Sequence, residues 1–154
     1  MKLTQPYLYI KFLLIALFAL GVHTTQAQEN RSMMEYLVQE RPVLSDLLTK
    51  AGFTPLLSGN VQITLFAPSE STLQSISNES PERLRAILSS HIVKGVYLEQ
   101  DLKEGKSLTP VCNTSSITIY RKRGQTLVNG VSIQRPDVQV KNGVVHELAG
   151  MIRS

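Results

Sequence analysis

The 154-residue chain has one cysteine, Cys112, and no tryptophan. A single cysteine cannot close an internal disulfide, so the hydrophobic core has to stabilise the fold. We expect Cys112 to be a small, half-buried thiol. A reactive thiol or an intermolecular disulfide is the alternative.

A long hydrophobic run is also missing. The main apolar stretch, residues 12–22, is much shorter than the ~20 residues that span a bilayer. It follows Lys2 and Lys11 and precedes two small residues, Thr25 and Ala27, in the arrangement of a secretory signal peptide. We therefore predict that residues 1–27 are a cleaved signal peptide. Residues 28–154 are then expected to form a single secreted domain without a transmembrane anchor.

Neither sign of charge dominates the mature part of the chain. The leader holds two of the 16 Lys and Arg residues and none of the 12 acidic ones, which leaves 14 basic and 12 acidic residues. A nucleic-acid-binding domain carries a clear basic face, so we expect no nucleic-acid partner. The one local cluster, residues 121–124, is typical of a solvated hairpin turn.

Signatures of catalytic and cofactor-binding sites are absent from the sequence. It has no Gly-x-Ser-x-Gly nucleophile motif and no glycine-rich phosphate loop. A zinc site needs three or four converging ligands, whereas His91, His146 and Cys112 are far apart in sequence. We therefore expect no enzyme activity, no metal and no cofactor, and we interpret both histidines as buried, hydrogen-bonded core residues.

The first half of the mature chain has the pattern of helices around one strand. Ser32 and Glu35 form a capping box before an apolar stripe that includes Met33, Leu37 and Val38. A second helix is expected after Pro42, capped by Ser45. Ser80 and Pro81 predict a further helix start. Residues 61–66 alternate and then become apolar, which predicts a strand that enters the core.

The second half has the pattern of strands. Residues 116–120 and 126–128 predict a hairpin, and residues 131–133 and 138–140 predict strands interrupted at Pro136 and Asp137. Asn142 and Gly143 predict a tight turn with positive φ angles before a closing strand over residues 144–148. Helices followed by strands indicate an α+β fold.

Three segments, in this order, resemble the signature boxes of fasciclin domains. They are Thr-Leu-Phe-Ala-Pro-Ser at residues 64–69, His-Ile-Val-Lys-Gly-Val-Tyr at residues 91–97, and Asn-Gly-Val-Val-His-Glu-Leu from residue 142. The resemblance covers roughly residues 33–153. The matching signature residues are Phe66, Pro68, His91, Tyr97, Asn142, Gly143 and His146.

The resemblance implies a fasciclin-like α+β fold, with N-terminal helices packed on a wedge of two small β-sheets. It also implies a non-catalytic adhesion or interaction module that is periplasmic, at the cell surface or extracellular. Its partner would be an extracellular or cell-envelope protein or a polysaccharide. The alternative is a small carrier that binds an apolar ligand in a groove between helices and sheet.

The resemblance also implies a binding site at Asp137 and Val138. In animal matrix proteins of this family, an Asp followed by an Ile ahead of the closing box is implicated in integrin binding. Here Val138 replaces the Ile, and Arg135 stands where the animal motif has Glu. An exposed carboxylate beside an aliphatic side chain suits a receptor-bound divalent cation. The alternative for Asp137 is a turn residue that follows a proline.

Overall fold

A computed structural model describes residues 30–112 and 115–153 of the chain, so the predicted signal peptide lies outside the described residues. The helices are α3 (Met33–Glu40), α4 (Pro42–Lys50), α5 (Thr54–Ser58), α6 (Glu70–Gln74), α7 (Pro81–Ser89) and the short 3₁₀ helix η1 (Glu99–Asp101). The strands are β1 (Ile63–Ala67), β2 (Ile92–Lys94), β3 (Ser107–Leu108), β4 (Ile117–Lys122), β5 (Gln125–Val128), β6 (Val131–Val140) and β7 (Gly143–Leu148). The predicted α+β class is confirmed.

Serine capping residues set the starts of two helices, α3 and α7. The capping box of Ser32 and Glu35 is present at α3, and the Ser80 hydroxyl accepts a hydrogen bond from a backbone N–H at the start of α7. The predicted start of α4 at Ser45 is wrong, because α4 begins at Pro42 and Ser45 is a buried residue inside it. Proline fits the first helical position because the N–H that it lacks would have no partner there.

The expected apolar stripe of α3 is correct for only part of its length. Met33 and Leu37 are fully buried, and Tyr36 joins them. Val38 is 55% exposed, which corrects the prediction that it faces the core. One step of about 100° along a helix therefore separates the buried Leu37 from the solvent-facing Val38.

The strands form one seven-stranded sheet in the order β2-β1-β7-β6-β5-β4-β3. This hydrogen-bonded sheet replaces the expected wedge of two small sheets. Beyond β3 the chain turns back to β2, where Pro110 pairs with Val93 and the Val111 N–H donates to the Ile92 carbonyl at 2.8 Å. The sheet therefore bends until its two ends meet.

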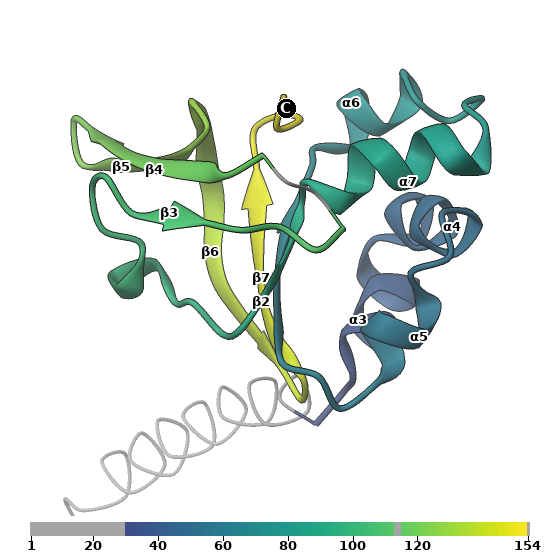
Figure 1. Cartoon of the computed structure of the whole chain (residues 1–154). Helices are drawn as coiled ribbons and strands as arrows, with labels where there is room; N and C mark the ends of the chain where they lie inside the picture. Colours follow the sequence, from purple (N-terminus) through teal and green to yellow (C-terminus); the bar gives the residue numbers. More distant parts are fainter. Residues whose placement is uncertain (1–29, 113–114, 154) are drawn as a thin grey trace, which may run out of the picture.

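Two hydrophobic cores lie on either side of the β1–β7 pair. Helices α3–α7 pack on one side of these strands, and the β3–β4–β5 part of the sheet lies on the other (Figure 1). Leu65 and Val145 belong to the helical core, whereas Phe66 and Leu148 belong to the core enclosed by the bent sheet. Successive strand residues point to opposite faces, so these two strands are buried on both faces.

The predicted interruption at Pro136 and Asp137 is an irregularity within the long strand β6. Arg135 pairs with Glu147, and Val138 pairs with Val145, so β6 contains one residue more than β7 over this stretch. An extra residue of this kind is a β-bulge, which turns a side chain away from its regular direction. The bulge places Asp137 at φ 58°, in the left-handed region.

The turn before β7 differs from the prediction in two ways. Asn142 does not have a positive φ, and its buried side chain instead connects distant elements. Its amide oxygen accepts the Met33 N–H at 2.7 Å, while its NH₂ group donates to the carbonyls of Leu57 and Gly59. Asn142 therefore links the start of α3 and the end of α5 to the sheet.

Candidate functional site

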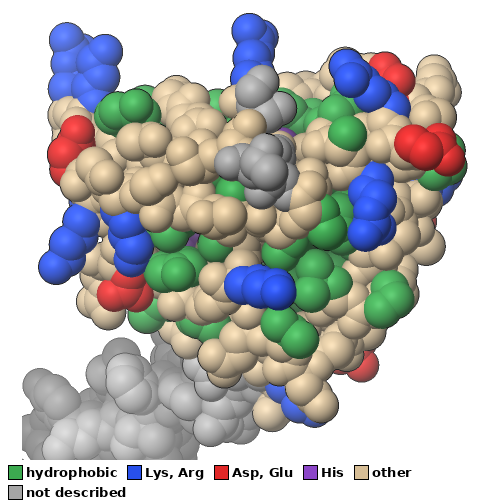
Figure 2. Space-filling model, viewed as in Figure 1, with side chains coloured by type: hydrophobic (Ala, Val, Ile, Leu, Met, Phe, Trp, Pro, Cys, Tyr) green, Lys and Arg blue, Asp and Glu red, His purple; other side chains and the backbone are tan. Residues whose placement is uncertain are grey.

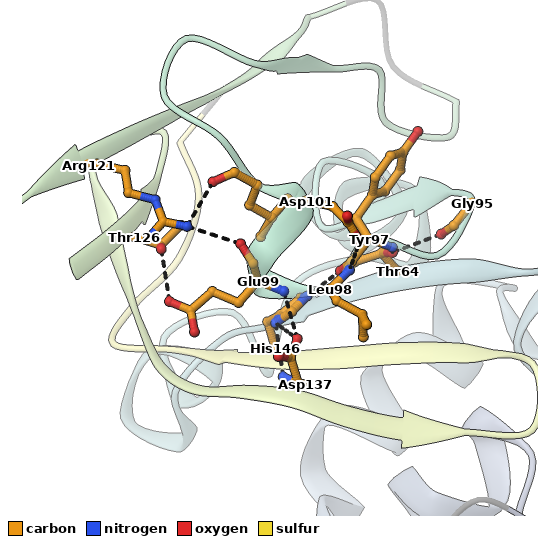
Figure 3. Close-up of polar contacts among 11 residues, drawn as sticks. Thr64, Gly95, Tyr97, Leu98, Glu99, Asp101, Arg121, Thr126, Asp137 and His146 are labelled. Carbon is orange, nitrogen blue, oxygen red and sulfur yellow. Dashed lines mark hydrogen bonds and ion pairs between the residues drawn. The ribbon is translucent and has the colours of Figure 1, made fainter. Parts of the chain in front are cut away.

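The candidate site is the β6 bulge and the loop that packs against it (Figure 3). Asp137 Oδ1 accepts a hydrogen bond from the Glu99 N–H at 2.7 Å, and the Asp137 side chain is 37% exposed. The carboxylate thereby caps the first residue of η1. Asp137 therefore has a turn-like conformation after a proline, which was the structural alternative for this residue. Its carboxylate is also accessible.

The side chain of Val138 points in the opposite direction. It is 4% exposed and belongs to the helical core. The expected carboxylate is therefore exposed beside an aliphatic residue, but the aliphatic side chain is not accessible to a partner. Of the two residues, only Asp137 presents its side chain at the surface.

The buried side chain of His146 contacts the β6 bulge from the interior of the fold. Its imidazole is fully buried and stacks on Phe66, with ring centroids 5.5 Å apart. Nδ1 accepts the Asp137 N–H at 3.2 Å, and Nε2 lies 2.7 Å from the Tyr97 carbonyl oxygen. Because Nδ1 is an acceptor, the ring proton has to lie on Nε2 and the ring is neutral.

The neutral ring agrees with the surroundings of His146. Burial lowers its pKa below the usual value, and the hydrogen bond to Tyr97 together with the charges of Asp137 and Glu99 opposes this shift. The Asp137 carboxylate lies 3.9 Å from Nδ1. Both ring nitrogens are occupied by backbone groups, so the predicted buried, hydrogen-bonded histidine is confirmed.

His91 is buried in the same way with the opposite tautomer. Nε2 accepts the Ile152 N–H at 3.0 Å, which leaves the proton on Nδ1, 3.2 Å from the Ile87 carbonyl. Burial lowers the pKa of His91 from 6.5 to about 4. His91 thereby connects the end of α7 to the C-terminal segment.

A second layer of polar contacts positions the loop of residues 95–101. Thr64 Oγ1 donates to the Gly95 carbonyl at 2.8 Å and accepts the Tyr97 N–H at 3.0 Å. The Tyr97 ring lies under the Lys106 ammonium group, 4.4 Å from the ring centroid. The hydroxyl of Thr64 on the central strand β1 therefore sets the position of Tyr97.

Residues that the sequence analysis did not single out connect the site to the hairpin. Glu99 Oε1 accepts from Thr126 Oγ1 at 2.9 Å, and Arg121 Nη2 donates to the carbonyls of Glu99 and Leu102. Residues 121–124 are exposed and lie at the hairpin tip as predicted, but Arg121 belongs to β4 and its side chain also holds η1. These partners are 19 to 27 positions apart in sequence, and no local pattern identifies them.

An ionic cluster around the buried Arg41 was also missed. Arg41 is 9% exposed and pairs with Glu70 at 2.9 Å and with Glu147 at 3.6 Å. It also donates to the Pro68 carbonyl at 2.5 Å, at the end of the first signature box. A buried arginine is usually paired, but nothing near Arg41 in the sequence identifies its partners.

The described residues offer no metal centre. Within residues 30–112 and 115–153, no group of three His, Cys, Asp or Glu side chains could hold a metal ion. Cys112 is exposed, which corrects the expectation of a half-buried thiol, and its Sγ lies 3.9 Å from Arg85 Nη2. In the same described part, no helix has the length and apolar character needed to cross a membrane.

A cleft of about 790 Å³ opens between the helices and the sheet. Ile76 and Ile87 line it from the helical side, and Val131, Met151 and Ile152 line it from β6 and the C-terminal segment. Polar groups such as Thr72 and Asn129 also reach it. A cleft of this volume is large enough for a small molecule.

The three signature segments come together in space. The first contains β1, the second contains β2 and the third contains β7, and these strands are neighbours in the order β2-β1-β7. His146 of the third segment stacks on Phe66 of the first and bonds to Tyr97 of the second. Phe66, Tyr97 and His146, one residue from each segment, therefore form one connected unit.

Comparisons with known proteins agree with this arrangement. The model of the fasciclin domain family matches residues 40–153. A fasciclin-like arabinogalactan protein of Cercospora beticola is 27% identical over 112 residues, which cover 70% of this chain and 30% of that protein. Transforming growth factor-beta-induced protein ig-h3 of Sus scrofa is 32% identical over 104 residues, covering 62% of this chain and 15% of that protein.

A similar fold is found among solved structures. The FAS1 domain pair of the insect cell adhesion molecule Fasciclin I superposes with a TM-score of 0.63 at 19% identity. The match covers 82% of this chain and 52% of that one. This chain thus spans less than a third of the two relatives and about half of the solved domain pair.

Proposed function

The chain belongs to the fasciclin domain family, and we propose that it is a secreted, non-catalytic adhesion or interaction module. Its partner is an extracellular or cell-envelope protein or a polysaccharide. The family match over residues 40–153 carries this proposal, because it includes the seven strands of the described residues together with His91 and His146. The similar fold of Fasciclin I, an insect cell adhesion molecule, also supports it.

The state of the two histidines supports a module without catalysis. A general base needs a free ring nitrogen within reach of a substrate. In His91 and His146 each ring nitrogen already faces a backbone group, and both rings are fully buried. These hydrogen bonds support a structural role for both residues.

We propose Asp137 as the acidic contact of this module. The bulge turns it out of the sheet, and the hydrogen bond from the Glu99 N–H fixes its carboxylate. A carboxylate that is held in place and partly exposed loses little conformational freedom when a partner cation or donor binds it. Val138 contributes to the site by anchoring β6 in the core.

Capture from a native envelope or matrix extract tests the proposal. The purified protein is expected to retain a partner that the Asp137→Ala variant loses. If the unchanged protein retains nothing, the interaction function is contradicted. If Asp137→Ala retains every partner, the function stands and the assignment of Asp137 is wrong.

The cleft between the helices and the sheet favours one alternative, a carrier for a small apolar ligand. Its apolar lining at Ile76, Ile87 and Met151 supports this role. Titration with a fluorescent apolar probe separates the two functions. The adhesion proposal predicts no saturable binding, whereas saturable binding that Ile87→Glu abolishes would favour the carrier.

A further inference from the structure

The β3–β4–β5 part of the sheet has an outer face that neither core uses. Along β4, Ile117 and Ile119 are buried, whereas Tyr120 is 48% exposed and Lys122 is also exposed. Side chains alternate between the faces of a strand, so Thr118, Tyr120 and Lys122 share the outer face. They are spaced about 7 Å apart along the strand.

Neighbouring strands extend this face with polar groups. Gln125 of β5 pairs with Lys122, Leu127 pairs with Tyr120, and Ser107 of β3 pairs with Thr118. On the inner face, Thr126 and Arg121 make the contacts with Glu99 that hold η1. The outer face therefore combines one aromatic ring with hydroxyl, amide and ammonium groups.

The hairpin tip adds a second cation in a defined position. Arg123 and Gly124 both have positive φ angles, 51° and 79°, as expected for the two central residues of a tight hairpin turn. Lys122 and Arg123 make no ion pair with any described residue. Their charges are therefore available to a ligand.

Charge is distributed unevenly along the chain. Residues 94–135 contain seven Lys and Arg residues and three acidic residues. Residues 30–93 contain five Lys and Arg residues and six acidic residues. The three acidic side chains are occupied within the fold: Glu99 by Thr126, Asp101 by the Leu98 N–H and Glu104 by the Arg121 N–H. In Figure 2, several Lys and Arg side chains project from the end of the molecule at the left of the view, and others are spread over the rest of this face.

We propose that this outer face, made of Thr118, Tyr120, Lys122 and Gln125 with Arg123 at its tip, binds an acidic polysaccharide whose sugars carry carboxylates. The inference rests on the proposed function and names the chemical class of its partner. The Tyr120 ring packs on the apolar face of a sugar, and the hydroxyl and amide groups bond to sugar hydroxyls. Lys122 and Arg123 pair with the carboxylates.

The composition of the face favours this partner over two others. A protein interface usually has a buried apolar centre, but here Leu127 and Tyr120 stand among polar side chains. Recognition of an acidic membrane typically uses a cluster of four to eight Lys and Arg residues, whereas the tip offers two unpaired ones. Two cations beside one ring suit a polymer with moderate charge density.

Affinity for defined polymers tests the inference with the purified protein. Isothermal titration with polygalacturonate is expected to show binding, and neutral dextran is expected to show none. Lys122→Gln combined with Arg123→Asn should weaken binding about fivefold to twentyfold, because asparagine tolerates the positive φ at residue 123. Tyr120→Leu should weaken binding about threefold to tenfold through loss of the ring.

A matched control removes the same charge from the helical side of the molecule. Lys50→Gln combined with Arg83→Gln changes two exposed cations on α4 and α7 and should leave the affinity within about twofold, since salt screens distant charges. The inference is overturned if the hairpin double variant binds polygalacturonate as tightly as the unchanged protein. Binding only to dextran sulfate or to phosphatidylglycerol vesicles also overturns it.

The polygalacturonate experiment and the capture experiment can fail independently of each other. If the protein captures an Asp137-dependent partner from extract but does not bind polygalacturonate, the acidic-polysaccharide inference is wrong and the interaction function stands. If both experiments fail, the interaction function is wrong as well.

Discussion

His91 connects three parts of the fold through its imidazole and its backbone carbonyl. Its side chain bonds to the Ile87 carbonyl and the Ile152 N–H, and its own carbonyl accepts the Phe66 N–H at 2.8 Å. Protonation would replace the acceptor at Nε2 with a donor facing the Ile152 N–H. The folded protein therefore requires the neutral ring.

This requirement predicts how stability depends on pH. The folded pKa of His91 is lowered to about 4 from 6.5, so between these values the unfolded chain takes up a proton that the folded chain does not. The contribution of His91 is complete above pH 6.5 and is lost as the pH falls towards 4. The free energy of unfolding should drop by roughly 3 kcal/mol over this range.

Urea unfolding at pH 7, 5.5 and 4 measures this dependence, with His91→Gln as the comparison. The variant should be less stable at pH 7, because it loses part of the hydrogen bonding. It should also show a smaller decrease towards pH 4, since residue 91 no longer titrates. Equal decreases in both proteins would contradict the role assigned to His91.

Asn142 shows which residue properties the sequence could and could not predict. The pair of Asn142 and Gly143 correctly indicated the end of one strand and the start of another. The partners of Asn142, at Met33, Leu57 and Gly59, are more than 80 residues away in sequence. Turn propensity is a local property, so it carries no information on such contacts.

Replacement of Asn142 tests its linking role. Asn142→Ala leaves the Met33 N–H and two carbonyls without their partner and should lower the free energy of unfolding by about 2–4 kcal/mol. Asn78→Ala, at an exposed position, should change it by less than about 0.5 kcal/mol. Chemical denaturation of both variants measures the free energy of unfolding. A similar small loss in both would show that Asn142 does not link the helices to the sheet.

At the scale of elements, the pairing of β1 with β7 depends on a close approach at Gly143. A Cβ atom on Gly143 would lie 1.8 Å from the Ile63 carbonyl oxygen. Ile63 and Gly143 are partners in the parallel ladder that joins the two strands. Glycine is therefore required at residue 143 mainly because β1 leaves no room for a Cβ atom there.

Two glycine replacements separate space from backbone conformation. Gly143→Ala should lower the free energy of unfolding by more than about 3 kcal/mol, because β1 has to move away from β7. Gly130 has φ +83°, and a Cβ atom there would meet nothing within 4 Å beyond its chain neighbours, so Gly130→Ala should cost only about 1–2 kcal/mol. Thermal unfolding of the two variants measures these losses of stability. Equal losses would show that the close approach of β1 and β7 at Gly143 is unimportant.

The elements were predicted from the sequence with uneven success, and the reasons are physical. Ser32 and Ser80 marked helix starts because side-chain capping is a local interaction. The start of α4 was misplaced because the helix was expected only after Pro42, although Pro42 occupies its first turn. The joining of the strands into one sheet depends on long-range pairing such as that of β1 with β7, and the closure of its ends depends on the bridge between Pro110 and Val93. Alternation along single strands cannot show either contact.

At the scale of the whole molecule, the signature segments identified the fold, whereas the proposed contacts with a partner lie on the surface. The segments meet in β2, β1 and β7, so their residues serve the packing of the centre. The family match confirms the resemblance. Of the contact pair that the resemblance implied, Val138 is a core residue and Asp137 is exposed beside it, because the β-bulge lies between them and their neighbours on β7.

The proposal that Asp137 is the binding carboxylate of an interaction module is tested most directly by Asp137→Asn. Asparagine keeps the positive φ and an oxygen for the Glu99 N–H, so the melting temperature should stay unchanged while the charge is lost. For the partner captured by the unchanged protein, surface plasmon resonance should show an affinity at least about tenfold weaker. An unchanged affinity in a variant of equal stability would contradict the proposal.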